Sequence, residues 1–387
     1  MIYLDNAATT RLDPAVLDVM RPWLEDDYGN ASALYQLGRR ARVAIEEARA
    51  TLAELIGAEP AEIVFTSGGT EANNTVLKSL AWQTRTAHTI ACSMVEHHAV
   101  LHPAEALAET GIELVLLPVT SEGVLDLDAL PYRLNRPDVL VSVMHSNNET
   151  GALQPIDQLR ERLPNAMIHT DAVQSFGKVP FDVRQLGVDF ATISAHKIHG
   201  PKGIGALYVR RGTRLEPFVH GGGQERGRRG GTEAVALIVG FAEAARRAHA
   251  AMTKRSEHMR RLRDMLVELL CAEIPDIRIN TPDRALPNIL NISFLDAEHL
   301  DGEAILQLLD MEGIACSNGS ACTSGSMQPS HVLKAMGRPD AEARAAVRFS
   351  LSKDTTDDDI RTAADALAEI IASLRQSTHT GSIFAAR

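Results

Sequence analysis

The sequence has few cysteines, and they lack the spacing of a metal site or a disulfide scaffold. The four cysteines, Cys92, Cys271, Cys316 and Cys322, include no CxxC pair and form no dense secretory framework. We therefore expect reduced thiols and a cytoplasmic protein. No apolar run approaches the roughly 20 residues of a transmembrane helix, and residues 1–6 lack the basic and apolar regions of a signal peptide. The sequence predicts no membrane partner.

Excess positive charge is also lacking. Asp and Glu number 50 against 39 Lys and Arg, which gives a formal net charge of −11. Nucleic acids and anionic membranes favour proteins with excess positive charge, so neither is expected as a main partner. The hydrophobic content of 45% and charged content of 23% are ordinary for a globular protein. With 387 residues, the chain is long enough for about two or three domains.

Short apolar segments alternate with helical patterns between about residues 60 and 210. The segments cover residues 62–66, 88–92, 113–117, 139–143, 166–169, 190–193 and 204–208. Apolar strands separated by helices predict an α/β fold with a mainly parallel seven-stranded sheet and helices on both faces. Ligands bind at the carboxyl ends of the strands in such sheets.

The remainder of the chain predicts a smaller α+β domain. Residues 233–270 have a helical pattern without proline and look like a long connector. Further on, the pattern predicts strands at 277–279, 289–294 and 346–349, and helices near 300–311 and 357–374. We place the large domain at residues 15–260 and the small domain at residues 1–14 and 261–387.

Three motifs follow predicted strands. In residues 66–74, glycines such as Gly69 let backbone N–H groups approach an anion, and Thr70 adds a hydroxyl; a plain capped strand–helix turn is an equal alternative. Asp171 could meet a ligand cation or cap a helix. Lys197 could be an amine nucleophile in an apolar site or a surface lysine.

Together these three motifs supply what pyridoxal 5′-phosphate requires. A lysine forms the Schiff base, a carboxylate keeps the pyridine nitrogen protonated, and an anion cradle holds the phosphate. Two weaker signals accompany them. His97 could stack on a flat ring and move protons, or be an ordinary surface histidine. Arg348, in an apolar strand, could bind a substrate carboxylate or form a structural salt bridge.

Cys322 lies in residues 317–326, a run of Ser, Asn, Gly, Ala and Thr. A structural cysteine is usually surrounded by large apolar residues, whereas these neighbours build a solvated loop. The pattern therefore indicates a reactive thiol on a mobile loop.

With these motifs in view, the sequence resembles the cysteine desulfurases, the NifS/IscS family of the class V aminotransferase-like group. The resemblance runs from residues 3–10 to the strand with Arg348 and includes residues 28–32, 145–151 and 220–227. The amino-acid sequence is more similar to the nitrogen-fixation, NifS-like branch of the family at residues 147–151, 178–180, 226–229 and 322–326. The sequence departs from the family at Ala195, where glycine is usual, and at Cys316 and Asn318 before Gly319.

The resemblance implies fold type I of the pyridoxal-phosphate-dependent transferases. Lys197 would carry the cofactor, Asp171 would pair with its pyridinium nitrogen, and Gln174 would contact its phenolic oxygen. The implied phosphate ligands are Gly69, Thr70, Ser194 and His196. Thr232 would reach the phosphate of the neighbouring subunit, which implies a homodimer with shared active sites.

The implied reaction converts L-cysteine to L-alanine. Asn148 and Arg348 would hold the substrate carboxylate, His97 would stack on the cofactor and help deprotonate the thiol, and Cys322 would take the sulfur as a persulfide. The sulfur would pass to a NifU/IscU-like scaffold protein for iron–sulfur cluster assembly, with nitrogenase supply as one version. No metal site is expected, and Cys316 is expected to be a buried strand-end residue. The alternatives are a selenocysteine lyase, another class V transferase, or a non-catalytic sulfur carrier.

Overall fold

A computed structural model describes residues 1–83, 89–297, 300–319 and 328–384. Its centre is a seven-stranded sheet with the strand order β2-β8-β7-β6-β5-β3-β4. The strands are β2 (Ile63–Thr66), β3 (Thr89–Ser93), β4 (Glu113–Leu117), β5 (Val139–Ser142), β6 (Met167–Asp171), β7 (Phe190–Ser194) and β8 (Gly205–Val209). β8 runs antiparallel to β7 and β2, and the other pairs are parallel. The predicted α/β class and mainly parallel seven-stranded sheet are confirmed.

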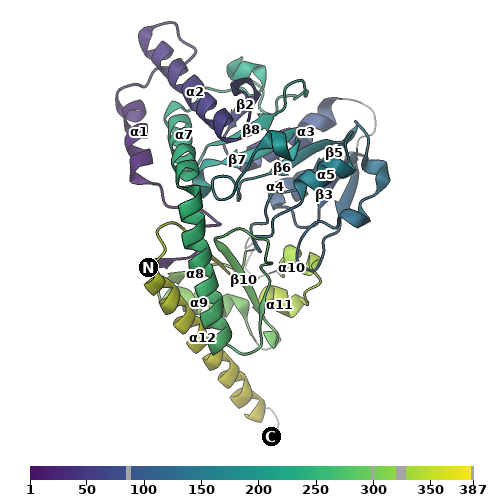
Figure 1. The fold of residues 1–387 in the computed structure, drawn as a ribbon, viewed down its shortest axis with the longest axis vertical. Coiled ribbons are helices and arrows are strands. Elements are labelled where there is room, and N and C mark those ends of the chain that lie inside the picture. The colour runs from purple at the N-terminus through teal and green to yellow at the C-terminus, as the bar shows by residue number, and fades with distance from the viewer. Residues whose placement is uncertain (84–88, 298–299, 320–327, 385–387) are drawn as a thin grey trace.

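Helices bury both faces of this sheet, which is why its strands read as apolar runs (Figure 1). In β5, Val139 and Val141 face one hydrophobic cluster and Leu140 faces another. The first cluster contains residues of α1 (Pro14–Glu25), α2 (Gln36–Leu55), α5 (Ile156–Arg162) and α7 (Val235–Ala250). The second contains residues of α3 (Gly69–Gln83) and α4 (His98–Ala108).

A further antiparallel sheet, in the order β12-β10-β9, lies in the lower part of Figure 1. Its strands are β9 (Ile277–Ile279), β10 (Ile289–Phe294) and β12 (Val347–Ser350). They share a separate hydrophobic cluster with α8 (Met252–Glu273), α9 (Gly302–Met311) and α12 (Asp357–Phe384). The short helices of the chain are α6 (Val183–Leu186), α10 (His331–Ala335) and α11 (Asp340–Arg344). The limits that we predict for the two domains remain a prediction.

The predicted connector consists of two helices. α7 ends and α8 begins at Ala251, whose backbone leaves the helical conformation with φ −106° and ψ 8°. Together they form the long green column that joins the upper and lower parts of Figure 1. α12 continues to Phe384, past the end at residue 374 that the sequence pattern predicts.

The N-terminal segment joins the smaller sheet region to the large sheet. β1 (Ile2–Tyr3) pairs in parallel with β11 (Ile314–Ala315). Asn6 Nδ2 then donates to the Ser350 carbonyl at 2.8 Å, and the Thr10 N–H donates to the His196 carbonyl at 3.0 Å. Residues 2–10 therefore run from the smaller sheet region to the carboxyl end of β7.

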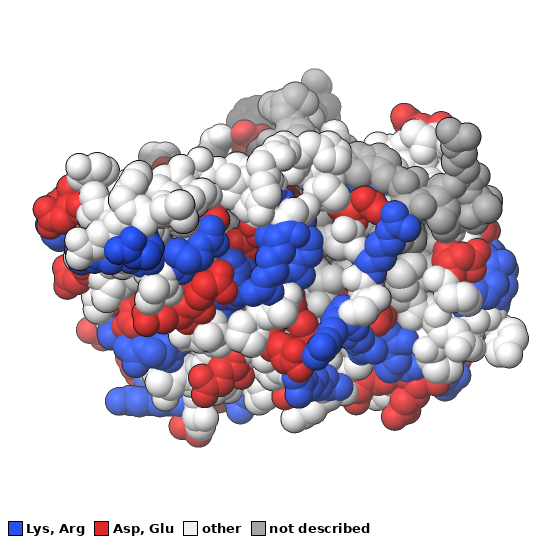
Figure 2. Space-filling model, turned by 90° about the horizontal axis from the view of Figure 1, so that it is seen from above, with Lys and Arg blue, Asp and Glu red and all other residues white. Residues whose placement is uncertain are grey.

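Charged side chains of both signs are interspersed on the face seen in Figure 2. This distribution agrees with the modest excess of acidic residues in the sequence. Among the described residues, no helix combines the length and the apolar character needed to cross a membrane.

Candidate active site

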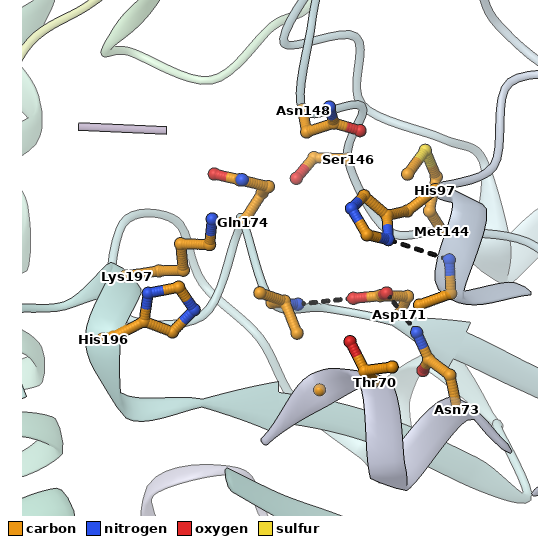
Figure 3. A pocket seen from close by; sticks show the side chains of 13 residues that line it. Thr70, Asn73, His97, Met144, Ser146, Asn148, Asp171, Gln174, His196 and Lys197 are labelled. Atoms are coloured by element: carbon orange, nitrogen blue, oxygen red, sulfur yellow. Dashed lines mark hydrogen bonds between the residues drawn. The ribbon is translucent and has the colours of Figure 1, made fainter. Parts of the chain in front are cut away.

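A cavity of about 220 Å³ lies at the carboxyl ends of the strands. We call it the first chamber. Side chains from the turns after several strands and from the start of α3 point into it (Figure 3). Its lining comprises Gly69, Thr70, Asn73, His97, Ala99, Met144, Ser146, Asn148, Asp171, Val173, Gln174, His196 and Lys197.

The start of α3 forms the floor of the first chamber. Gly69 is the first residue of this helix, so the unpaired N–H groups of the first turn lie beside the cavity and favour an anion. A Cβ atom on Gly69 would come within 2.8 Å of Val173 Cγ2. The close approach of β6 and α3 thus requires glycine here.

Asp171 is fixed by two hydrogen bonds and faces the same chamber. Its Oδ1 accepts from the Val173 N–H at 2.9 Å, and its Oδ2 accepts from Asn73 Nδ2 at 2.7 Å. Sequence reasoning missed Asn73, although it lies one helical turn after Gly69 and therefore faces the same way. These bonds hold the carboxylate toward the cavity in one orientation.

Lys197 follows β7 and lines the same chamber. Its Nζ donates to the carbonyls of Ala7 and Ala8 at 2.5 and 2.6 Å. Burial lowers the pKa of Lys197 to about 8, and the positive charge of Arg348 acts in the same direction. A lysine in this state has a sizeable unprotonated fraction near neutral pH, as an amine nucleophile or base requires.

Two histidines lie on opposite sides of the first chamber (Figure 3). His97 Nδ1 accepts the Ala99 N–H at 3.0 Å, and burial lowers the pKa of His97. His196 Nδ1 lies 3.2 Å from Thr9 Oγ1, and burial lowers the pKa of His196 to about 4. Both rings are therefore neutral at physiological pH.

Gln174 and Ser194 differ in their relation to the cavity. Gln174 lines it, donates from Nε2 to the Ala7 carbonyl at 2.9 Å, and has a buried Oε1 with no partner among the described residues. Ser194 Oγ instead donates to the Ile204 carbonyl at 3.4 Å, and Ser194 is not part of the lining. The structure brings Gln174, but not Ser194, to the cavity.

A second chamber of about 380 Å³ adjoins the first and shares His97, Asn148, Gln174 and Lys197 with it. Arg348 lines this chamber, and its side chain is only 5% exposed. Its Nη2 donates to Asp5 Oδ1 at 2.6 Å and to Ser317 Oγ at 2.7 Å, and its Nη1 donates to the Asn148 carbonyl at 2.9 Å. Arg348 therefore both faces a ligand-sized space and forms a salt bridge, the two alternatives that the sequence left open.

Three titratable residues of the second chamber were not selected by sequence reasoning: Asp5 and Glu149, which lie within quoted motifs, and His331, which lies outside them. Glu149 is buried, which raises its pKa, and its Oε2 accepts from Ser330 Oγ at 2.5 Å. Asp5 belongs to a motif quoted for the resemblance, but its motif gave no sign that the side chain would meet Arg348. Contacts between residues 343 positions apart are not visible in a local pattern.

Besides Ser194, two further predicted site residues are not placed at either chamber. Thr232 is exposed and lines a separate hollow with Tyr28 and Asn30. Cys322 lies in residues 320–327, outside the described residues. Gly319 and His331, in the described chain on either side of that stretch, both line the second chamber.

The structure describes two of the residues that depart from the family pattern. Ala195 is buried, and a Cβ atom on Gly200 would come within 2.8 Å of both its methyl group and its carbonyl oxygen, so the chain is closely packed between positions 195 and 200. Cys316 follows β11 and is half-buried against the hydrophobic cluster of the smaller sheet. Burial raises the pKa of Cys316 to about 12, so its thiol stays protonated. Within the described ranges, no group of His, Cys, Asp or Glu could hold a metal ion.

Comparisons with known proteins agree with this fold. The aminotransferase class-V family model matches residues 2–362. A cysteine desulfurase IscS from Dictyoglomus turgidum is 45% identical over 97% of this chain and 95% of its own length. The cysteine desulfurase NifS of Azotobacter vinelandii is 44% identical over 97% of this chain and 93% of its own length.

A solved structure named as a NifS-like protein superposes with a TM-score of 0.88 at 38% identity, covering 96% of this chain and 99% of the other. Relatives of both names, IscS and NifS, match to nearly the same extent. The resemblance that the motifs indicate is thereby confirmed. The chain belongs to the aminotransferase class-V family and, within it, to the cysteine desulfurases.

Proposed function

We propose that this protein is a pyridoxal-5′-phosphate-dependent cysteine desulfurase that converts L-cysteine to L-alanine and places a persulfide on Cys322. One observation carries the proposal: Lys197, Asp171 and the start of α3 line a single chamber that adjoins a second chamber containing Arg348. Curated relatives at 45% and 44% identity are named cysteine desulfurases, which supports the same reaction.

The residues of the first chamber fit the cofactor. The N-terminus of α3, with Thr70, suits its phosphate, and the fixed carboxylate of Asp171 suits its pyridinium nitrogen. The buried Oε1 of Gln174 lacks a partner among the described residues, which leaves an unsatisfied polar group at a ligand site. When bound, the cofactor would supply an electron sink for the bonds around the substrate Cα.

Lys197 would hold the cofactor covalently and, once released, remove the Cα proton with Nζ. The lowered pKa of Lys197, about 8, suits both tasks because each needs the unprotonated amine. While the amine is not bound to the cofactor, the carbonyls of Ala7 and Ala8 would accept hydrogen bonds from it, as they do in the structure.

His97 would stack on the cofactor ring and move a proton at Nε2. Its Nδ1 already accepts from Ala99, so the neutral ring carries its proton on Nε2 and is arranged to donate. His97 could accept a proton from the substrate thiol on Nδ1 only after the hydrogen bond from the Ala99 N–H is broken. The help with thiol deprotonation that the resemblance implies would therefore require His97 to move.

The second chamber would hold the substrate carboxylate with Asn148 and Arg348. The Cys322 thiolate would then attack the substrate sulfur: the new S–S bond forms as the substrate C–S bond breaks, and the electron pair stays with the carbon that becomes the methyl group of alanine. The outer sulfur of the persulfide would pass to a NifU/IscU-like scaffold protein for iron–sulfur cluster assembly.

A homodimer with shared active sites completes the proposal. Thr232 is exposed beside apolar surface residues, including Tyr28, which is 75% exposed, and Leu24, which is 61% exposed. A second copy over this surface would bury these side chains and receive the hydroxyl of Thr232 at its phosphate. We also propose a cytoplasmic location, because the four cysteines do not form the dense framework of a secreted disulfide-bonded protein.

The test combines Cys322→Ser with measured products. The unmodified protein, loaded with pyridoxal phosphate, should form alanine and sulfide from L-cysteine with a reducing thiol present. Cys322→Ser should keep the visible absorbance of the bound cofactor and lose both products. Continued alanine formation by this variant would remove Cys322 from the reaction, and faster turnover of selenocysteine than of cysteine would favour a selenocysteine lyase.

A further inference from the structure

Asp5 lies in the second chamber, and the reaction described above gives it no task. It follows β1 and forms an isolated bridge with Ser350, so its backbone is anchored beside β12. Its side chain is 19% exposed and lines the chamber together with Arg348 and Lys197. A carboxylate at the place where a substrate carboxylate should bind requires an explanation.

Asp5 occupies the end of Arg348 that a ligand can reach. Arg348 Nε is buried and has no partner among the described residues, so it is closed off from the chamber. Three of the four N–H groups on Nη1 and Nη2 already donate to Asn148, Ser317 and Asp5, and the fourth belongs to the same small guanidinium. A substrate carboxylate that uses this guanidinium must therefore lie close to the carboxylate of Asp5.

Two neighbouring carboxylates repel each other, and a partly buried site screens this repulsion weakly. A plain carboxylate adds a full negative charge beside Asp5. An α-amino acid adds no net charge, because its ammonium group accompanies its carboxylate. Asp5 should therefore weaken the binding of plain carboxylates much more than the binding of zwitterions.

The other titratable groups around the chamber do not remove this difference. They are Lys197, Glu149 and the histidines His97, His98 and His331. At unchanged protonation of these groups, replacing Asp5 by a neutral residue makes the chamber one charge more positive. That change favours an anion over a neutral zwitterion.

We infer that Asp5 is a selectivity residue that makes the substrate chamber prefer zwitterionic amino acids to simple carboxylates. It pairs with Arg348 while the chamber is empty, which compensates a nearly buried guanidinium, and it disfavours ligands that bring a carboxylate alone. The inference rests on the proposed function, because it takes the second chamber as the substrate site.

L-Alanine and propionate provide a matched pair of probes, since they share the carbon chain and differ in the α-amino group. Isothermal titration calorimetry of the cofactor-loaded protein gives the two dissociation constants without any turnover. Asp5→Asn, which keeps the shape and an acceptor for Arg348, should strengthen propionate binding about tenfold and change L-alanine binding less than about threefold.

Asp5→Glu keeps the charge and should keep the preference of the unmodified protein. Asp357→Asn is the control for losing an Asp–Arg pair, because Asp357 pairs bidentately with Arg261 on the exposed surface and lines neither chamber. It should leave both constants unchanged. If Asp5→Asn folds poorly, Asp5→Ser tests the same charge.

An unchanged ratio of the two dissociation constants in Asp5→Asn overturns the inference, as does an equal weakening of both ligands, which would mean that Asp5 only positions Arg348. Failure of the proposed function looks different. In that case the unmodified protein forms no alanine from L-cysteine and binds neither probe.

Discussion

The two chambers of this protein are built in different ways. In the first chamber, Thr70, Asp171 and Lys197 each lie at or shortly after the carboxyl end of a strand of the large sheet, so short local motifs bring them together. In the second chamber, Asp5 meets Ser317 and Arg348, which lie more than 300 residues further along the chain, through the smaller sheet region. Local geometry therefore organises the chamber proposed for the cofactor, and long-range packing organises the chamber proposed for the substrate.

This contrast predicts that variants of the two chambers fail in separable ways. Changes in the first chamber should alter cofactor attachment, and changes in the second should alter substrate affinity. The following predictions test that separation, in order of decreasing effect.

Lys197→Ala should have the largest effect. Without the amine, the cofactor has no covalent link and the Cα proton has no base, so we expect alanine formation to fall by on the order of 10³-fold or more. Borohydride reduction followed by mass spectrometry of the intact protein measures the attachment. Cofactor fixed to the Lys197→Ala chain after reduction would show that another lysine does this task.

Arg348→Ala should raise the KM for L-cysteine by about 10- to 100-fold, because it removes charge-assisted hydrogen bonds to the substrate carboxylate and leaves Asp5 unpaired. The cofactor content, measured from visible absorbance, should stay at the level of the unmodified protein. Loss of cofactor in Arg348→Ala, at an unchanged melting temperature, would contradict the separation of the two chambers.

Asn73→Ala should affect the first chamber alone and should lower the turnover rate to about one tenth of normal. It removes the 2.7 Å hydrogen bond that fixes Asp171 Oδ2, and a hydrogen bond to a charged group contributes about 1.5–3 kcal/mol. Steady-state kinetics should show a lower kcat with a KM for L-cysteine within about twofold of normal. A raised KM with normal kcat would place Asn73 on the substrate side instead.

The pH dependence of cofactor attachment should follow Lys197. Its folded-state pKa is lowered from the ordinary value of 10.5 to about 8, so the reactive amine predominates above pH 8 and falls about tenfold per pH unit below it. The attachment rate of pyridoxal phosphate to cofactor-free protein, followed by absorbance from about pH 6 to about pH 11, measures this. A rate that levels off only above about pH 10 would mean that burial does not lower the pKa.

Ala195→Gly should have the smallest effect. This substitution restores the usual glycine of the family, removes one buried methyl group and adds backbone freedom. It should therefore lower the free energy of unfolding by about 1–2 kcal/mol. Thermal unfolding followed by circular dichroism measures the loss. A clear gain in stability would show that Ala195 is strained against Gly200.

The same contrast explains what the sequence could predict. All seven strands of the large sheet were predicted to within two residues at each end, because each is an apolar run between helical patterns. Thr70, Asp171 and Lys197 were selected because each belongs to a motif at a strand end, whereas Gln174, Asn148 and His196 were implied by the family resemblance. The break between α7 and α8 at Ala251 could not be predicted, because no glycine or proline stands there. The antiparallel direction of β8 was missed because strand direction is not encoded in an apolar run.

The long-range contacts lay beyond sequence patterns. Nothing near Asp5 indicates that it pairs with Arg348, and nothing near Ala7 indicates that its carbonyl receives both Lys197 and Gln174. Ser194 stands at a strand end like the cavity residues, yet its hydroxyl turns to Ile204. Position at a strand end predicts nearness to the site but does not decide the direction of the side chain.

The path of residues 2–10 has a consequence for any shortened product that begins further along the chain. Met20 is the next methionine after Met1. A product started there would retain every strand of the large sheet and the residues of the Lys197 and Asp171 motifs. It would lack the carbonyls of Ala7 and Ala8, the carboxylate of Asp5 and the amide of Asn6 that ties β12 to this segment. Loss of nineteen leading residues would therefore act as an active-site lesion, although it removes none of the residues that sequence motifs identify as reactive.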